Sequence, residues 1–216
     1  MKTLALIHTT PVTVTAMKAL AAERAPGVRV INLLDDSLLP DVMRAGHLTP
    51  EVTDRLRVYA HAAVHAGADA VMCCCSSVGD AVETLRSELA VPFLRIDEPM
   101  ADQAVRLGSR VGVIATVAST LEPTARLIER AGARAGLPVQ VERVLVGGAY
   151  DALMEGRPEE HDALVTAALQ GLTARAQVVV LAQASMARLL PGLPPSATPI
   201  LSSPEGGLER ALEVLT

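Results

Sequence analysis

Short apolar segments alternate with stretches of helical periodicity along almost the whole of this 216-residue chain. Between the short segments, apolar side chains recur every three or four residues, as in 52–63 and 164–172. Strands that alternate with helices in this way form βαβ units with a parallel sheet. The sequence therefore predicts an α/β fold whose strands begin near Leu4, Val28, Ala70, Phe93, Val111, Val139, Val178 and Ile200.

The second half of the chain also repeats landmarks of the first half at an offset of 107 or 108 residues. The matched segments are 7–9 with 114–116, 69–75 with 177–183, 92–94 with 199–201 and, with a drift of two or three residues, 41–46 with 151–156. Self-similarity at one offset is the sequence signature of a repeated unit. We therefore predict two similar doubly wound parallel-sheet domains related by pseudo-twofold duplication.

The segment that follows the fourth strand, around Asp97, is the expected crossover between the halves. Residues 1–97 together with 202–216 are predicted to form the first α/β domain, and 98–201 the second. Ligands of open α/β sheets bind outside the carboxyl ends of the strands. If the two domains turn these ends towards each other, the active site is expected in the cleft between them.

Composition excludes several classes of function. The 19 basic residues are outnumbered by 24 acidic ones and form no basic run, so nucleic acid finds little to bind. Aromatic side chains are limited to Tyr59, Phe93 and Tyr150, too few to form stacking surfaces. No apolar stretch approaches the roughly 20 residues that cross a membrane. We therefore expect a small polar ligand, and neither a nucleic-acid nor a membrane partner.

The cysteines indicate a reducing compartment. All three are adjacent, at 73–75, a spacing that suits neither a disulfide framework nor a zinc site. The histidines at 47, 61, 65 and 161 share no metal-ligand spacing. The amino-terminal sequence MKTLALIHTTPV is typical of a buried strand rather than of a signal peptide. These features predict a cytoplasmic protein without a metal site.

Cys75 is the candidate nucleophile or base. It ends a predicted strand and precedes Ser76, Ser77 and Gly79 at the start of a helix. Amide groups at a helix amino terminus stabilise a thiolate and lower its pKa, and they can also hold a carboxylate. We predict that Cys75 is the reactive thiol with a lowered pKa, whereas the two preceding cysteines are core residues.

Other polar side chains follow predicted strand ends and are candidates for the same site. Thr9, Thr10, Thr116 and Ser119 suit either a bound carboxylate or a helix cap. Further candidates for substrate binding are Ser76, Ser77 and Ser185. His8 could transfer a proton near neutral pH, although a strand-end histidine is often structural. The chain lacks the glycine-rich, GxSxG and HExxH motifs of nucleotide-binding proteins, serine hydrolases and zinc proteases.

Four segments, 69–77, 96–101, 112–116 and 201–204, resemble the aspartate/glutamate/hydantoin racemase superfamily. The resemblance implies a cofactor-independent homo-oligomeric enzyme in which two thiols flank the α-carbon of a bound carboxylate. It assigns Cys75 to the first thiol, Ser76 and Ser77 to the polar residues after it, and Thr116 to carboxylate binding. The position of the second thiol is occupied by Gln183.

Gln183 leaves three functions open, because an amide is neither a base nor a proton donor near neutral pH, although it can polarise an enolate. The chain could be a racemase or isomerase of a small amino, hydroxy or keto acid, or of a hydantoin, in which His8, Ser185 or water handles the second proton. It could be a single-thiol decarboxylase or lyase that resembles the arylmalonate decarboxylase branch. It could also be a binding protein for small anions.

Overall fold

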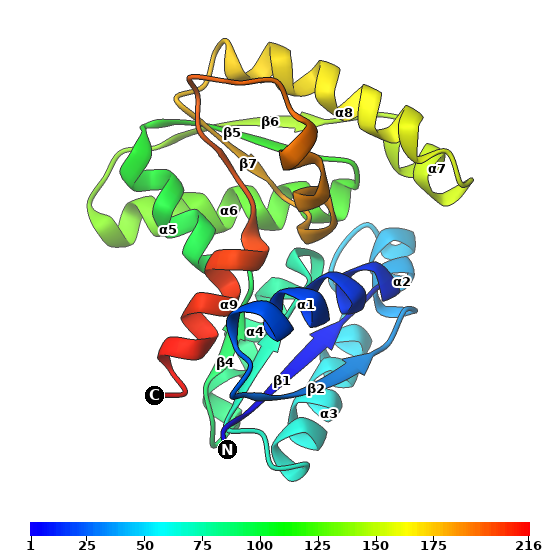
Figure 1. Cartoon of the computed structure of the whole chain (residues 1–216), viewed down its shortest axis with the longest axis vertical. Helices are drawn as coiled ribbons and strands as arrows, with labels where there is room; N and C mark the ends of the chain where they lie inside the picture. The colour runs from blue at the N-terminus through cyan, green and yellow to red at the C-terminus, as the bar shows by residue number, and fades with distance from the viewer. The chain divides into compact units, whose positions relative to one another are not determined.

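The computed structural model describes residues 1–216 as two compact units, each built on one four-stranded sheet (Figure 1). The first unit comprises Met1–Pro99 and Pro204–Thr216, and the second comprises Met100–Ser203. All six strand pairings are parallel. The strand order is β2-β1-β3-β4 in the first unit and β6-β5-β7-β8 in the second. The predicted class of fold, α/β with two similar parallel sheets, is confirmed.

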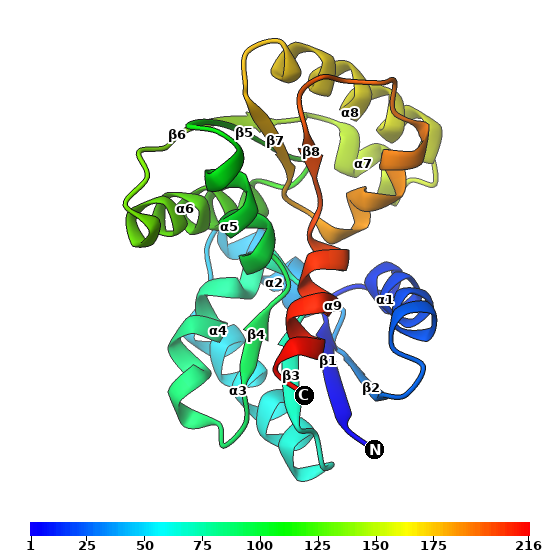
Figure 2. The ribbon, with the colours of Figure 1, turned by 60° about the vertical axis from the view of Figure 1, so that its left-hand side comes forward.

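The strands begin within one residue of the predicted positions, because each strand contains a short apolar run. The first unit contains β1 (Thr3–His8), α1 (Pro11–Arg24), β2 (Arg29–Leu34), α2 (Leu38–Ala45), α3 (Pro50–His65), β3 (Ala70–Cys73), η1 (Ser76–Val78), α4 (Gly79–Leu85), η2 (Arg86–Glu88), β4 (Phe93–Arg95) and most of α9 (Ser203–Glu213). The second contains most of α5 (Glu98–Leu107), β5 (Arg110–Ala115), α6 (Ala118–Ala135), β6 (Gln140–Leu145), α7 (Ala149–Met154), α8 (Pro158–Thr173), β7 (Val178–Leu181), η3 (Ala184–Gly192) and β8 (Ile200–Leu201), which lies beside β7 in Figure 2.

Each sheet is buried by helices because its central strands, β1 and β3 in the first unit and β5 and β7 in the second, are apolar on both faces. In the first unit, Ile7 and Val71 pack with residues of α2, α3 and α4 on one face, and α1 contacts β1 and β2. In the second unit, Val113 and Val180 pack against α5 and α6, whereas Ile114 and Val179, which point the other way, pack against α8 and η3. None of the helices is both long and apolar enough to cross a lipid bilayer.

Matching hydrogen bonds show the repeat at atomic detail. The carbonyl of Ile7 accepts from the amide of Cys74 at 2.8 Å, and the carbonyl of Ile114 accepts from the amide of Ala182 at 3.0 Å. These donors and acceptors are 107 or 108 residues apart, as the sequence landmarks are. Gly46 and Gly156, which follow α2 and α7, both adopt a left-handed φ, of 74° and 76°. The conformation favours glycine because it has no Cβ.

One local prediction differs from the structure. Strand β3 ends at Cys73, two residues earlier than expected, and Cys75 lies in the loop that follows. The next turn, η1, is a 3-10 turn, and the α-helix begins only at Gly79. This short connection turns the backbone amides of η1 back towards the Cys75 side chain.

Candidate active site

In the first unit the candidate residues lie at the carboxyl ends of β1 and β3, which are neighbouring strands. The register pairs Ile7 with Cys73, so the segments that leave the two strands run side by side. Thr9 is buried in the segment after β1, whereas Cys75, in the segment after β3, is partly exposed. The topology thus brings together two residues that are 66 positions apart in the sequence.

Four hydrogen-bond donors converge on the sulfur of Cys75. They are the hydroxyl of Thr9, the backbone amides of Ser77 and Val78, and the hydroxyl of Ser77. Donors of this kind favour the thiolate over the neutral thiol. The structure therefore places Cys75 beside the backbone amides of a helical turn, as the sequence predicts.

The predicted lowering of the Cys75 pKa is wrong for this structure. Burial raises the pKa of the Cys75 thiol above its ordinary value, and the hydrogen bonds from Thr9 and from the amides of Ser77 and Val78 offset that rise only in part. The reason is that moving a negative charge out of water costs more than these donors return. At neutral pH Cys75 is thus mainly a neutral thiol.

The other two cysteines are core residues. Cys73 and Cys74 are buried, and burial raises the pKa of both thiols. The sulfur of Cys73 lies 3.8 Å from the carbonyl oxygen of Cys75, and that of Cys74 lies 4.0 Å from the carbonyl of Met72. Neither sulfur receives the set of amide donors that reaches Cys75.

His8 is enclosed within the first unit, with both ring nitrogens engaged. Its Nδ1 lies 3.1 Å from the hydroxyl of Thr13 and its Nε2 lies 3.0 Å from the amide oxygen of Asn32. The side chain is fully buried, and this burial lowers the pKa of His8 despite the hydrogen bond to Asn32. A neutral histidine satisfied on both sides favours the structural role over proton transfer.

Thr10 and Ser76 also have partners in the first unit. Thr10 occupies the cap position of α1, but its side chain makes no hydrogen bond to the helix amides and lies 3.4 Å from the hydroxyl of Thr13. Ser76 is buried, and its hydroxyl donates to Asp97, which keeps the pKa of that carboxyl low together with Arg95. The sequence analysis used Asp97 only to mark the crossover between the halves, and it overlooked Arg95. Their position at the end of the strand next to β3 was the available signal.

In the second unit, Thr116 and Gln183 form a contact at the carboxyl ends of β5 and β7. The side-chain oxygen of Gln183 accepts from the amide of Thr116 at 2.7 Å and from its hydroxyl at 3.1 Å. Ser119 lies in the first turn of α6, and Ser185 lies in η3 directly after Gln183. Gln183 therefore takes the place that Cys75 has relative to Thr9, but as an acceptor without an acidic proton.

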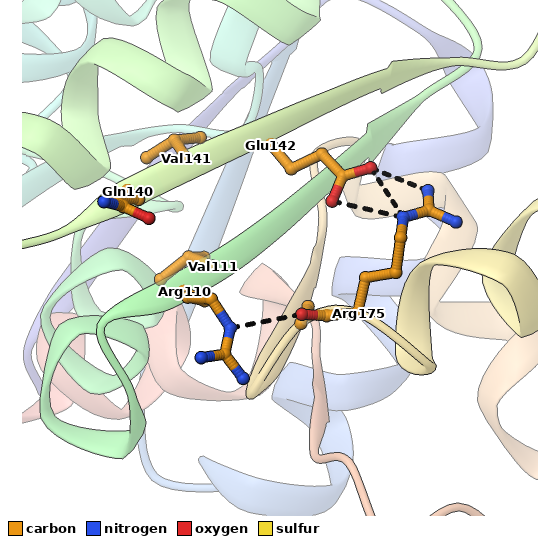
Figure 3. A pocket seen from close by; sticks show the side chains of 7 residues that line it. Arg110, Val111, Gln140, Val141, Glu142 and Arg175 are labelled. Atoms are coloured by element: carbon orange, nitrogen blue, oxygen red, sulfur yellow. Dashed lines mark hydrogen bonds and ion pairs between the residues drawn. The ribbon is translucent and has the colours of Figure 1, made fainter.

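A separate hollow of about 260 Å³ lies at the opposite, amino-terminal edge of the second sheet (Figure 3). Its two arginines are Arg110 and Arg175. Arg175 is paired with Glu142 at 2.6 and 3.0 Å, and Arg110 donates to the carbonyl of Arg175 at 3.3 Å. Because the charge of Arg175 is already matched and the hollow is open to water, this hollow offers no built site for an anion.

The fold and these residues define a class of protein. It has two α/β units, each with a parallel sheet, and a thiol that accepts hydrogen bonds from backbone amides just beyond a strand end. The sequence profile of the Asp/Glu/Hydantoin racemase family matches residues 7–211, and the chain belongs to that family.

Solved structures at low sequence identity share the fold. A glutamate racemase from Bacillus anthracis is 16% identical, with a TM-score of 0.73 over 98% of this chain and 81% of that one. An allantoin racemase from Klebsiella pneumoniae is 16% identical, with a TM-score of 0.70 over 100% and 90%. An arylmalonate decarboxylase is also 16% identical, with a TM-score of 0.61 over 99% and 92%. No curated protein sequence gives a significant match.

Proposed function

We propose that this protein is a cofactor-independent racemase or isomerase that moves a proton at the carbon next to a carboxylate, with Cys75 as the proton-transfer group. The substrate class is a small amino, hydroxy or keto acid, or a hydantoin. Family membership supports proton transfer of this kind, and the hydroxyl-rich strand ends support an anionic substrate. The observation that carries the proposal is the convergence of the Thr9 hydroxyl and the Ser77 and Val78 amides on the Cys75 sulfur.

The raised pKa of Cys75 is compatible with this chemistry. A thiolate with a high pKa is a strong base, which is what removal of a proton from carbon requires. In the proposed reaction, the thiolate of Cys75 takes the α-proton, and the electrons of the C–H bond move into the carboxylate to give an enediolate. Reprotonation of that carbon by water from the opposite face inverts the configuration, and the hydroxide that remains takes the proton of Cys75 through the solvent, which restores the thiolate.

We propose that Thr9, Thr10 and Ser77 line the binding site of the substrate carboxylate, with Thr116, Ser119 and Ser185 as further lining residues. Gln183 is proposed to orient the substrate through its amide NH₂ group, since its oxygen already accepts two bonds from Thr116. This assignment requires no acid or base chemistry of the glutamine.

A second candidate, a single-thiol decarboxylase or lyase, is favoured by two observations. Cys75 is a neutral thiol at neutral pH, which is the form that donates a proton to an enediolate, and Gln183 provides no second thiol. In that reaction the C–C bond of a malonate breaks, carbon dioxide leaves, and the electron pair stays as an enediolate that takes the Cys75 proton. The proton returns to Cys75 from water.

The test is solvent exchange in D₂O with a panel of amino acids, hydroxy acids, hydantoins and malonates, followed by proton NMR and by release of carbon dioxide. A racemase or isomerase incorporates deuterium at the α-carbon, and a decarboxylase releases carbon dioxide. A small-anion-binding protein does neither, yet its ligand raises its melting temperature.

The same assay with Cys75→Ser identifies the thiol. Loss of the group that transfers the proton should reduce turnover by about 100-fold or more. Cys74→Ala is the matched control, because it removes a neighbouring thiol that lacks the donors of Cys75, and it should stay within about twofold of wild type. Turnover of Cys75→Ser within about tenfold of wild type would remove Cys75 from the mechanism.

A further inference from the structure

A buried arginine and a buried aspartate lie beside the loop that carries Cys75. The side chains of Arg95 and Asp97 are each 1% exposed. Strand β4 pairs with β3 so that Arg95 is opposite Cys73, and the amide of Ile96 donates to the carbonyl of Cys73 at 3.1 Å. The segment 95–97 therefore runs alongside 73–75, within the first unit.

Arg95 is held by carboxylates on two sides. Its Nε and Nη2 donate to the two oxygens of Asp97 at 2.9 and 3.0 Å, in the bidentate geometry that suits a guanidinium and a carboxylate. Its Nη1 donates to Glu83 and, at 3.4 Å, to Asp80, both on α4. The guanidinium lies against the backbone of Gly79, where an added Cβ would be 2.4 Å from its Cζ. These contacts leave the guanidinium little freedom to move.

Asp97 in turn holds the residue that follows Cys75. Burial acts to raise the pKa of Asp97, but the charge and hydrogen bonds of Arg95 and a hydrogen bond from Ser76 bring the pKa below its ordinary value. The carboxylate is thus ionised and accepts from the Ser76 hydroxyl. Ser76 is the first residue of η1, and the amides of the next two residues point at the Cys75 sulfur.

We propose that Asp97, held by Arg95, is a positioning residue for Cys75: by anchoring Ser76 it fixes the orientation of η1, and with it the amide donors that face the sulfur. The inference rests on the proposed function only in taking Cys75 as the reactive thiol. Without the anchor, η1 can turn and its amides no longer stay aligned with the sulfur. The thiolate then loses stabilisation, and the Cys75 pKa rises further.

The test measures the thiol directly, without a substrate. Wild type, Ser76→Ala and Asp97→Asn are alkylated with iodoacetamide across a pH series, and modification of Cys75 is followed by peptide mass spectrometry, which separates it from Cys73 and Cys74. Ser76→Ala should shift the midpoint of the Cys75 profile upward by about 0.5 to 1 pH unit, which is about three- to tenfold less thiolate below the midpoint. Asp97→Asn should shift it upward by less, because it also removes a buried negative charge that disfavours the thiolate.

Two further variants separate positioning from general damage. Ser76→Thr keeps the hydroxyl and should retain the wild-type midpoint. Glu98→Gln is the matched control, because it breaks another partly buried ion pair nearby. Glu98 accepts from Arg86 at 2.5 and 3.3 Å. Arg86 also donates to the carbonyl of Phe93, and not to the loop that carries Cys75. Glu98→Gln should leave the midpoint unchanged. Ser76→Ala combined with Asp97→Asn should shift the midpoint no further than the larger single shift, because both remove one contact.

An unchanged midpoint in folded Ser76→Ala would overturn the proposal, and so would an equal shift in Glu98→Gln. If Asp97→Asn does not fold, the comparison of Ser76→Ala with Ser76→Thr still tests whether the Ser76 hydroxyl sets the midpoint of the Cys75 profile. The proposed function fails separately: absence of turnover in wild type, together with a shifted midpoint in Ser76→Ala, rejects the enzyme but keeps the positioning role. Wild-type Cys75 that is not alkylated at any pH at which the protein stays folded would overturn both.

Discussion

The side-chain oxygen of Gln183 accepts two hydrogen bonds from one residue, Thr116, at 2.7 Å from its amide and 3.1 Å from its hydroxyl. In the first unit the hydroxyl of Thr9 donates to Cys75, and the two pairs are related by the internal repeat. In each unit a threonine after the first strand donates to an acceptor after the third strand. The acceptor is a thiol in the first unit and a side-chain amide oxygen in the second.

Gln183→Cys is expected to place a thiol where Thr116 already supplies donors. If the two positions serve one substrate, as we propose, the variant gains or accelerates racemisation, because a second thiol can return the proton from the other face. The measurement is the loss of optical activity of an enantiopure substrate, with deuterium incorporation from either enantiomer. Gln183→Ala, which lacks any acid or acceptor, is the control and should show no gain; an equal gain in both variants would contradict the prediction.

The pH dependence of turnover should reveal the raised pKa of Cys75. If the thiolate removes a proton, kcat/KM rises with pH, and its midpoint lies above the value of about 8.5 expected for an ordinary thiol. Thr9→Val removes one of the donors that favour the thiolate and should move the midpoint still higher. A kcat/KM that falls as pH rises through this range would instead identify the neutral thiol as the active form and favour the decarboxylase.

His8 should make the protein less stable in mild acid. Its pKa in the folded state is lowered by burial, so as pH falls the unfolded state binds a proton first. The free energy of unfolding contributed by His8 is complete above about pH 6.5 and decreases as pH falls from there towards the folded-state pKa. Urea unfolding followed by circular dichroism should therefore show a shallower loss of stability between pH 7 and pH 5 in His8→Gln. Identical slopes would mean that His8 does not titrate differently on unfolding.

Gly79→Ala should destabilise the first unit, because the new methyl group would lie 2.4 Å from the guanidinium of Arg95. Overpacking of this kind costs about 1–3 kcal/mol. Gly27→Ala is the matched substitution, since nothing lies within 4 Å of its Cβ position, and it should change stability by less than about 0.5 kcal/mol. Chemical denaturation compares the two, and equal stability of both variants would show that Arg95 moves aside at no cost.

Much of the fold could be predicted from sequence because the central strands β1, β3, β5 and β7 are short, largely buried apolar runs. Ile7, Val71, Val113 and Val180 belong to such runs, and local hydrophobic patterning is enough to locate them. The likeness of the two halves was also visible, because the repeat places strand ends at one offset. The termination of β3 at Cys73 was not predictable, since nothing in three consecutive cysteines marks which one leaves the sheet.

The sequence by itself determined the alternation of strands and helices, the duplication, and Cys75 as the thiol nearest a helical turn, because these depend on residues close together in the chain. Tertiary structure decided the chemistry of that thiol. The pKa of Cys75 depends on burial and on Thr9, and the anchoring of its loop depends on Arg95 and Asp97, all supplied by other strands. Electrostatic interactions follow distance in space and exposure to water, and neither can be read from positions along the chain.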